Sequence, residues 1–526
     1  MNPSQPFVPE SRLLSKTRPV RAALEPPVLM ITPPSAFLLD ERVFMSLGIL
    51  KIAAVLEHAG RRVEFLDLSG IANYTDVVDA HVRTTTAHVV ALTTTTPQLP
   101  AATKVVERIR ALRPDMRIIV GGPHVTLVHA AVKLERKAGR IARAHRALAQ
   151  LETMFDVLVS GDGETAIFEA LREDAPKVVD GDDPKGGLFM TDATYDASPY
   201  PARHLVDVDS YKYTIDGHRA ISLIAQLGCP FGCGFCGGRN SKALRMIRTR
   251  TTRSIVDEIE LLHRNYGVTG FMLYDDELNV NKSLVELMNA ISDLQARLGV
   301  EFRLRGFVKS ELFNDAQAEA MYRAGFRWIL CGFEAASPRI LDNINKRATL
   351  EDNTRVVDIC HRHGLKIKAL MSVGHPGESE ESIRAVHDWL IQVRPDDFDC
   401  TVITTYPGTP YYDEALPHES LANTWTYTAR RTGDKLHAYD VDFTATAEYY
   451  KGDPDGGYHS YVFTDSLSAE ELVRLRNWVE ADVREKLSIP FNPGAASIRY
   501  EHSMGQSALP AFVLRKSAPA GEAVGA

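Results

Sequence analysis

Short apolar runs alternate with amphipathic helical patterns along most of the chain. In the first part, apolar residues recur every three or four positions between the runs, as they do in a helix with one buried face. Helices are expected over 44–58 and 101–113, the second stopping at Pro114. The pattern is typical of a parallel sheet with helices on both faces, a Rossmann-like α/β domain. The predicted strands are 28–34, 63–68, 89–95, 117–122 and 156–164.

A second region repeats a strand–helix unit six times. Six such units predict a partial (β/α)6 barrel of the TIM type, with its chemistry at the carboxyl ends of the strands. The predicted strands are 221–228, 270–277, 301–308, 327–334, 366–374 and 398–405. The predicted helices are 252–266, 282–298, 315–324, 350–363 and 379–393.

A chain of 526 residues is too long for one ordinary core, and two or three domains are expected. Within the first domain, the basic segment 127–152 is expected to be a solvated helical insertion. The aromatic residues between 425 and 463 are expected to belong to a packed core, and the alternative is a surface on which a substrate stacks. The predicted parts are a flexible arm (1–26), the first α/β domain (27–175), a linker (176–205), the barrel (206–415), a mixed C-terminal domain (416–505) and a disordered tail (506–526).

Composition limits the kinds of partner. The chain is 44% hydrophobic and 24% charged with a net charge of −8, which gives no indication of nucleic-acid or acidic-membrane binding. The longest mostly apolar run, 44–56, contains Lys51 and is too short to cross a bilayer. Six cysteines and no secretory segment favour a reducing, cytoplasmic location.

Three cysteines lie on one short loop directly after the first barrel strand. Cys229, Cys233 and Cys236 have the spacing C-x3-C-x2-C, with glycines and two phenylalanines between them. Three thiolates can hold three irons of a 4Fe–4S cluster and leave the fourth iron open. Structural zinc prefers four closed ligands, and the nearest histidines, His218 and His263, stand at no zinc-finger spacing.

The loop resembles the signature of the radical S-adenosylmethionine (SAM) superfamily, including Phe235 just before the last cysteine. The resemblance implies that SAM chelates the open iron and yields a 5′-deoxyadenosyl radical on reduction. It also implies SAM contacts after the following barrel strands. Asp276 and Glu277 follow strand two, and Glu334 stands in a G-F-E-A turn after strand four, where relatives have serine in place of Ala335.

Two glycine–proline turns extend this resemblance. Gly374 opens the G-H-P-G-E turn after strand five, and Tyr406 opens the Y-P-G-T-P turn after strand six. Arg305, within strand three, could meet a carboxylate in the barrel lumen or form a structural ion pair. One departure is Gln226-Leu227-Gly228 before the first cysteine, where relatives commonly have serine–arginine–glycine.

A parallel α/β domain in front of such a barrel resembles the cobalamin-dependent (B12-binding) radical SAM enzymes of the methyltransferase type. Two turns carry that resemblance: one matches G-G-x-H, and the other matches G-E-G-E with Asp162 in place of glutamate. The residues that the resemblance assigns to cobalamin are Thr93, Thr94, Gly121, Gly122, His124, Gly161, Gly163 and Glu164.

Many cobalamin proteins supply a histidine to cobalt through D-x-H-x-x-G, and this chain has no such motif in the right place. The only D-x-H is 79–81, which precedes the third strand and lacks the glycine. We therefore expect cobalt without a histidine ligand. His124 is expected near the nucleotide tail of the cofactor, and the loop 35–42 is expected to cover the lower face of cobalt.

The resemblance implies a C-methyltransferase in which one SAM methylates cobalamin, a second SAM gives the radical, and methylcobalamin delivers methyl to an unactivated carbon. An external low-potential electron donor of the flavodoxin or ferredoxin type is expected, with a small, specialised metabolite as substrate. The alternative keeps both cofactors but catalyses cyclisation or oxidative rearrangement. A non-enzymatic cobalamin carrier would leave the cysteine loop and the barrel turns unexplained.

Overall fold

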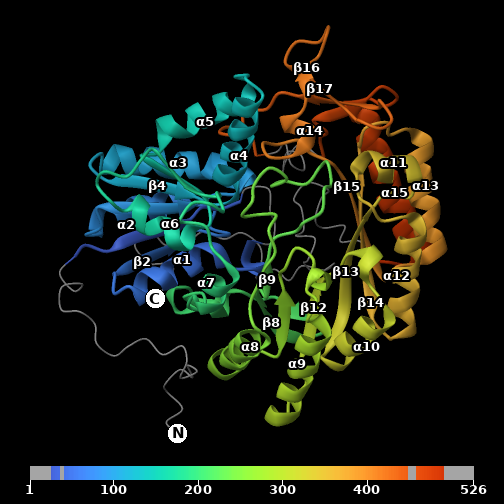
Figure 1. Ribbon diagram of the computed structural model, residues 1–526, viewed down its shortest axis with the longest axis horizontal. Helices are drawn as coiled ribbons and strands as arrows, with labels where there is room; N and C mark the ends of the chain where they lie inside the picture. Colours follow the sequence, from blue (N-terminus) through green and yellow to red (C-terminus); the bar gives the residue numbers. More distant parts are fainter. Residues whose placement is uncertain (1–24, 36–40, 448–457, 491–526) are drawn as a thin grey trace.

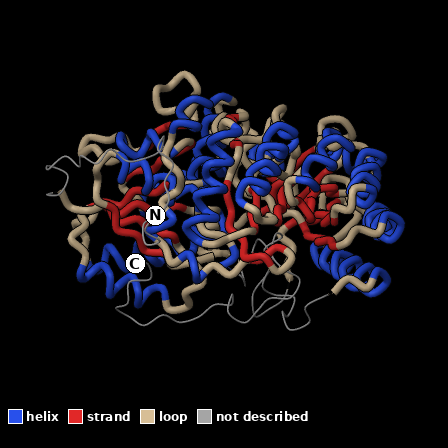
Figure 2. The backbone as a smooth tube through the Cα atoms, turned by 90° about the horizontal axis from the view of Figure 1, so that it is seen from below, coloured by secondary structure: helices blue, strands red, loops and turns tan. Residues whose placement is uncertain are grey.

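The computed structural model describes residues 25–35, 41–447 and 458–490. Residues 1–24 of the predicted arm lie outside the described part, as do the predicted tail and the segments 36–40, 448–457 and 491–505. Two groups of strands, each flanked by helices, lie beside one another and are joined by loops (Figures 1 and 2).

The first group is a six-stranded sheet in the order β2-β1-β3-β4-β5-β6, with every neighbouring pair parallel. All five predicted strands are present within a few residues of their expected bounds. The strands are β1 (Val28–Thr32), β2 (Val63–Asp67), β3 (Val89–Thr93), β4 (Arg117–Gly121), β5 (Val157–Gly161) and β6 (Val178–Gly181).

Helices cover both faces of this sheet, as the strand–helix alternation predicts. Around the first strands lie η3 (Glu41–Val43), α1 (Leu47–His58), α2 (Tyr74–Thr84), η4 (Thr96–Gln98) and α3 (Leu99–Leu112). Around the later strands lie α4 (Pro123–Lys137), α5 (Arg143–Met154) and α6 (Gly163–Ala170).

Two expectations about this region are wrong. The segment expected to be a linker contains β6, which continues the sheet, and helix α7 (Asp192–Ala197). The basic segment 127–152 is not a solvated insertion, because α4 is the crossover between β4 and β5 and most of its side chains are buried. Its exposed lysines and arginines gave it a misleadingly polar composition.

The second group is a seven-stranded sheet in the order β15-β14-β13-β12-β11-β8-β7. All neighbours are parallel except β7 and β8, which form a hairpin. The six predicted barrel strands are present, and the short β7 was not predicted. The strands are β7 (Thr214–Ile215), β8 (His218–Leu223), β11 (Gly270–Leu273), β12 (Arg303–Phe307), β13 (Phe326–Glu334), β14 (Lys366–Val373) and β15 (Asp397–Val402).

The barrel helices begin and end at the signals the sequence provides. Thr349 caps α12 in a capping box with Asp352, and α8 ends at Gly267, whose φ of 65° suits glycine. The helices are α8 (Thr252–Tyr266), α9 (Leu284–Leu298), α10 (Asp315–Arg323), α11 (Pro338–Ile344), α12 (Leu350–Arg362) and α13 (Glu380–Val393). The connecting segments include η5 (Arg203–Leu205), η6 (Val208–Ser210), η7 (Leu278–Val280), η8 (Ser310–Leu312), β9 (Gln226–Leu227) and β10 (Arg248–Thr249).

The C-terminal part is a small antiparallel sheet in the order β16-β17-β18-β19, followed by a helix that packs on α13 and β15. Among its described aromatic side chains, Tyr427 packs against Tyr411, with ring centroids 4.8 Å apart. The elements are α14 (Pro410–Asp413), β16 (Leu416–Pro417), β17 (Thr424–Thr428), β18 (Lys435–Tyr439), β19 (Val462–Thr464) and α15 (Ala469–Leu487).

One continuous apolar cluster joins the two large sheets. It contains Met30 and Val159 of the first sheet, residues of helix α1, and Phe271 and Met371 of the barrel. The buried face that the two parts share holds them in one arrangement. Among the described residues, no helix is long and apolar enough to cross a membrane.

Candidate functional site: the cysteine loop, the barrel mouth and the shared cavity

The cysteine loop lies at the carboxyl end of β8, and backbone hydrogen bonds fix it from three sides. The Cys229 N–H donates to the carbonyl of Leu244 (3.1 Å), and the Gly234 N–H donates to that of Ile344 (2.8 Å). The Tyr411 N–H donates to the carbonyl of Gly234 (3.1 Å). A Cβ at position 234 would collide with the Tyr411 ring, so only glycine fits there.

The three thiols suit an iron–sulfur cluster better than a single ion. No three His, Cys, Asp or Glu side chains among the described residues converge to hold one metal ion. A cube of iron and sulfide is larger and takes its thiolates from a wider spacing. Burial raises the pKa of Cys229 to about 11 and also raises those of Cys233 and Cys236. Ligation by iron would offset the free-energy cost of burying a thiolate, since a metal deprotonates the thiol that coordinates it.

The acids after β11 divide into a structural residue and two that face the site. Asp275 is buried and accepts N–H bonds from Ala225 (3.1 Å) and Gln226, which tie β11 to the strand before the cysteines. Asp276 is solvent-accessible on the wall of a cavity, and burial by the surrounding protein raises the pKa of its carboxyl. Burial raises the pKa of Glu277 to about 7, and its Oε2 has no hydrogen-bond partner. A buried carboxylate of this kind is an acceptor for an ammonium group.

Glu334 heads a second polar group in the barrel mouth. Its Oε1 lies 3.2 Å from Lys346 Nζ, and its Oε2 accepts a bond from Ser372 Oγ (2.9 Å). Ser372 Oγ also pairs with His375 Nε2 (2.8 Å), and burial lowers the pKa of His375 to about 3. Glu334 adopts a φ of 67°, a left-handed conformation that non-glycine residues adopt at some energetic cost.

The remaining predicted SAM residues surround the cysteine loop. The Phe235 ring meets His375 edge-to-face, with centroids 5.5 Å apart. Gly374 has a φ of 90°, and a Cβ there would lie 3.2 Å from Val462. Tyr406 packs beside Gly237 and also against the core of the first domain, so this side chain bridges the two parts of the molecule.

A cavity of about 350 Å³ lies between the carboxyl ends of the first sheet and the barrel mouth. Its sheet side is mostly apolar, and Gly228, Tyr274 and Asp276 line its barrel side. Six predicted cobalamin residues meet here: Thr93, Gly121, Gly122, Gly161, Gly163 and Glu164. Only glycine fits at position 122, since its φ is 96° and a Cβ there would lie 2.8 Å from the Thr94 nitrogen.

Two predicted cobalamin residues do not line this cavity. Thr94 is buried and bonds the carbonyl of Gly121 through its N–H (3.0 Å). His124 is buried against Thr96 Oγ1 (3.0 Å) and the Phe443 ring, and burial lowers its pKa to about 4. The described cavity lining contains no histidine. The loop expected beneath cobalt falls largely on residues 36–40, outside the described part.

Two further cavity residues, Thr126 and Arg248, were missed from the sequence. Thr126 accepts the Gly161 N–H (2.9 Å) and donates to the carbonyl of Gly122 (3.1 Å), which joins the two glycine turns. Arg248 forms a buried ion pair with Asp162, across the two domains. The G-D-G-E turn gave a signal for Asp162, but nothing local marked its partner, which lies 86 positions later.

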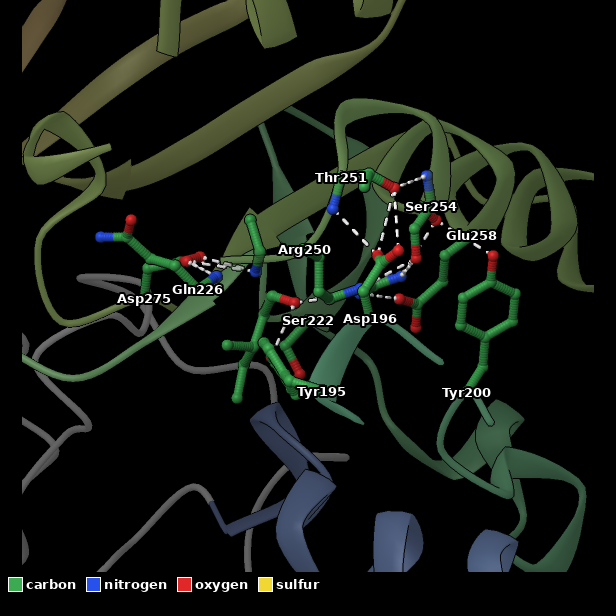
Figure 3. A network of polar contacts seen from close by, with 12 residues as sticks. Tyr195, Asp196, Tyr200, Ser222, Gln226, Arg250, Thr251, Ser254, Glu258 and Asp275 are labelled. Carbon is green, nitrogen blue, oxygen red and sulfur yellow. Dashed lines mark hydrogen bonds and ion pairs between the residues drawn. The ribbon is translucent and has the colours of Figure 1, made fainter. Parts of the chain in front are cut away.

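A polar network behind the barrel mouth joins the connecting segment to the barrel (Figure 3). Glu258 of α8 pairs with Arg203 (2.7 Å) and with Arg250, and all three side chains are buried. Asp196 of α7 accepts the Thr251 N–H (2.9 Å) at the start of the same helix. The network fixes α7 and α8, which flank the strand that leads into the cysteine loop.

Arg305 was expected either to contact a carboxylate in the barrel lumen or to form a structural ion pair. Its Nη1 donates to the Tyr213 hydroxyl (3.3 Å), and its guanidinium carbon lies 5.4 Å from the centroid of the Trp328 ring. Arg305 therefore belongs to the hairpin end of the barrel.

Comparisons with known proteins agree with this architecture. The family model "Radical SAM superfamily" matches residues 223–390, and the model "B12 binding domain" matches residues 41–152. The chain thus carries a B12-binding domain in front of a radical SAM domain, which confirms the resemblance and the fold class predicted from the sequence.

Several known proteins are similar over most of the chain. An uncharacterized methyltransferase of Pyrococcus horikoshii is 25% identical over 75% of this chain and 84% of its own. An anaerobic magnesium-protoporphyrin IX monomethyl ester cyclase of Rubrivivax gelatinosus is 25% identical over 70% of this chain and 62% of its own. The structure of the radical S-adenosylmethionine methyltransferase TsrM from Kitasatospora setae, with cobalamin and a [4Fe-4S] cluster bound, matches with a TM-score of 0.60 at 18% identity. That match covers 86% of this chain and 91% of TsrM and concerns the fold.

Proposed function

We propose that the protein is a cobalamin-dependent radical SAM methyltransferase that methylates an unactivated carbon of a small, specialised metabolite. The observation that carries the proposal is the cavity shared by the two domains. Its sheet side offers glycine turns to a large planar ligand, and its barrel side holds Asp276 next to the cysteine loop. In open α/β sheets, ligands bind beyond the carboxyl ends of the strands, where this cavity lies.

The cofactors supply the difficult steps: a radical that removes hydrogen from carbon, and a methyl group carried on cobalt. Cys229, Cys233 and Cys236 would hold the cluster. Asp276 and Glu277 would bind the ammonium group of SAM, because they provide carboxylate oxygens in an enclosed site. The protein positions the reacting groups and excludes water from them.

The first-domain residues suit a large ligand with polar edges. The glycines at 121, 122, 161 and 163 let the backbone approach closely, while Thr93 and Glu164 offer polar contacts at the rim. Below them, Met30, Ile49 and Ile167 form an apolar floor. A corrin ring has an apolar face and amide side chains at its edge, so this arrangement fits it.

The test uses anaerobically reconstituted protein with hydroxocobalamin, a chemical reductant and SAM labelled in its methyl group, incubated with an extract of small metabolites. We expect 5′-deoxyadenosine and a labelled metabolite, both measured by mass spectrometry. The Cys229→Ala/Cys233→Ala/Cys236→Ala variant, which keeps the first-domain cavity, should retain cobalamin but form neither product. Formation of 5′-deoxyadenosine without label in any metabolite would contradict methyl transfer.

A second function, cyclisation or oxidative rearrangement, uses the same cofactors. The similarity to the cyclase of Rubrivivax gelatinosus favours it, although this chain spans only 62% of that protein. The two functions differ in product mass. A cyclase product would contain no carbon from SAM, whereas a methylated product gains one labelled carbon.

A further inference from the structure

Basic side chains contact the cysteine loop where it is exposed to solvent. Pro230, which follows the first cysteine, is exposed. Arg245 lies against it: its Nη2 donates to the Pro230 carbonyl (2.7 Å), and its Nη1 donates to the Arg239 carbonyl (3.2 Å). Arg239 in turn donates to the carbonyl of Cys229 (3.0 Å).

Exposed basic side chains extend this site on two loops. Lys242 is exposed on the loop 239–247, and Arg347 is exposed on the loop that follows α11. Burial lowers the pKa of Arg245, and so does the positive charge of Arg239 and Arg347, which places these guanidinium groups within electrostatic range of one another. Asn345, on the loop after α11, donates to the Gly232 carbonyl of the cysteine loop (3.0 Å).

This surface contrasts with the rest of the chain. The protein carries a net charge of −8, yet no ion pair is recorded for Lys242, Arg245 or Arg347 among the described residues. The nearby Asp342 is already paired with Arg431. Met246, which follows Arg245 in the chain and has 43% of its surface exposed, adds an apolar side chain to the loop 239–247. A small apolar centre with a charged rim is typical of transient protein interfaces.

From this geometry we infer that Pro230, Lys242, Arg245, Met246 and Arg347, here called the basic rim, form the docking surface for a small acidic one-electron carrier protein. The inference rests on the proposed function, which requires a reduced cluster. One electron passes from the reduced carrier to the cluster; the carrier is oxidised by one electron, and no bond or proton changes. Docking at the basic rim places the carrier over the loop that contains Cys229.

The charge pattern favours an acidic protein as the occupant. A positive patch attracts an acidic partner over several ångströms and speeds the encounter, and the attraction weakens as salt screens it. A nucleic acid would need a longer basic stripe than these few residues provide.

The test uses the double variant Lys242→Glu/Arg347→Glu and a purified acidic flavodoxin as the probe. Neither side chain makes a hydrogen bond recorded in the structure, and Arg245 with its structural bonds is left in place. The matched control is Lys104→Glu, an exposed lysine on α3 of the first domain. The dissociation constant is measured by titration with the holoenzyme at low and high salt, and cluster reduction is followed by stopped-flow absorbance.

We expect the double variant to bind flavodoxin about tenfold more weakly at low salt, with a smaller salt dependence and slower reduction of the cluster. The control should behave as the wild type. Unchanged binding in the double variant, or equal weakening in the control, would overturn the assignment.

Chemical reduction with dithionite separates this inference from the proposed function. Dithionite needs no docking surface, so the double variant should form 5′-deoxyadenosine from SAM at the wild-type rate with it. If the wild type itself forms none with dithionite, the proposed function fails, whatever the flavodoxin titration shows. A milder double variant, Lys242→Gln/Arg347→Gln, should fall between the wild type and the charge reversal. If it binds as weakly as the charge reversal, the effect is not electrostatic and the inference fails.

Discussion

Burial raises the pKa values of individual carboxyl groups in the barrel mouth. The pKa values of Asp275, Glu277 and Glu378 are each raised to about 7, first by burial. An acid whose pKa is higher in the folded state binds more protons there than in the unfolded chain. The free energy of unfolding therefore falls as the pH rises from about 4.5 towards 7 and stays lower above it.

The Glu277→Gln variant tests this pH dependence of the free energy of unfolding, in protein without bound ligands. Because the amide carries no charge to desolvate, the variant should be more stable than the wild type at pH 8 by about 1–3 kcal/mol, and the difference should shrink below pH 5. Urea unfolding at both pH values measures it. Glu381→Gln, which replaces an exposed carboxylate on α13, is the control and should change little. A variant that is less stable at pH 8 would contradict the assigned burial effect.

The same substitution should weaken SAM binding. If Glu277 and Asp276 share the ammonium group, Glu277→Gln loses one charge-assisted hydrogen bond, which corresponds to about 1.5–3 kcal/mol. The dissociation constant of SAM for the cluster-loaded protein should rise by roughly tenfold or more, as measured by equilibrium dialysis. Equal affinity in the two proteins would place the ammonium group elsewhere.

At the scale of elements, helix α8 depends on a buried charge network. Glu258 satisfies two buried arginines, so its loss leaves two positive charges without a partner. The pKa of Glu258 is lowered to about 2, because the two guanidinium groups outweigh the burial that would raise it. The helix that follows the cysteine loop is thereby fixed to the segment that precedes β8.

Glu258→Gln should lower the free energy of unfolding by about 3–5 kcal/mol, the usual cost of breaking a buried ion pair. Glu380→Gln, which breaks an exposed i,i+4 pair with Arg384, should cost less than about 1 kcal/mol. Chemical denaturation of both variants provides the comparison. Similar losses in the two would show that the Glu258 network contributes no more than a surface pair.

The glycine turns at the ends of β4 and β5 can be tested in the same way. A Cβ at Gly163 would collide with the Ile52 side chain and push it into the cavity, whereas a Cβ at Gly48, also in the cavity wall, meets nothing within 4 Å. Gly163→Ala should weaken hydroxocobalamin binding by about tenfold, measured by absorbance titration. Gly48→Ala should bind nearly as the wild type does, and equal losses in both variants would argue against a steric cause.

At the scale of the molecule, two sets of contacts clamp the first domain to the rest of the chain. One is the shared apolar cluster, and the other is formed by arginines of the first domain that contact α14 and β17. The Arg143 guanidinium is buried 3.5 Å from the Tyr412 ring centroid and 4.4 Å from that of Trp425. Arg140 donates to the carbonyl of Asp413 (2.5 Å), and Asp413 accepts a bond from Asn240 (2.6 Å) beside the cysteine loop.

Arg143→Lys should loosen this clamp, because an ammonium group cannot stack on two rings as a planar guanidinium does. Hydrogen exchange of α14 and residues 406–413 should become faster, while exchange in α8 should not change. Arg146→Lys, at an exposed pair with Asp440, should leave both regions unchanged. Faster exchange everywhere would indicate general destabilisation instead of a local clamp.

Local signals in the sequence predicted most elements, because strand and helix periods, glycine stops and capping boxes act over a few residues. Helix α8 has its predicted bounds, and all eleven strands predicted for the two large sheets are present. The strand β6 was missed because four residues within an Asp- and Gly-rich segment carry too little pattern. Helix α4 was misjudged because composition does not show which face of a helix is covered.

The sequence by itself determined the two α/β units, their order and the three cysteines on one loop, since these follow from short-range patterns and spacing. Only the tertiary structure decided that Thr93 and Asp276 line one cavity and that Asp162 pairs with Arg248. It also decided that His124 contacts Thr96 and does not line that cavity. Contacts of this kind join residues far apart in the chain. They depend on the apolar cluster that the two sheets share, and that packing is a property of the assembled core rather than of any local segment.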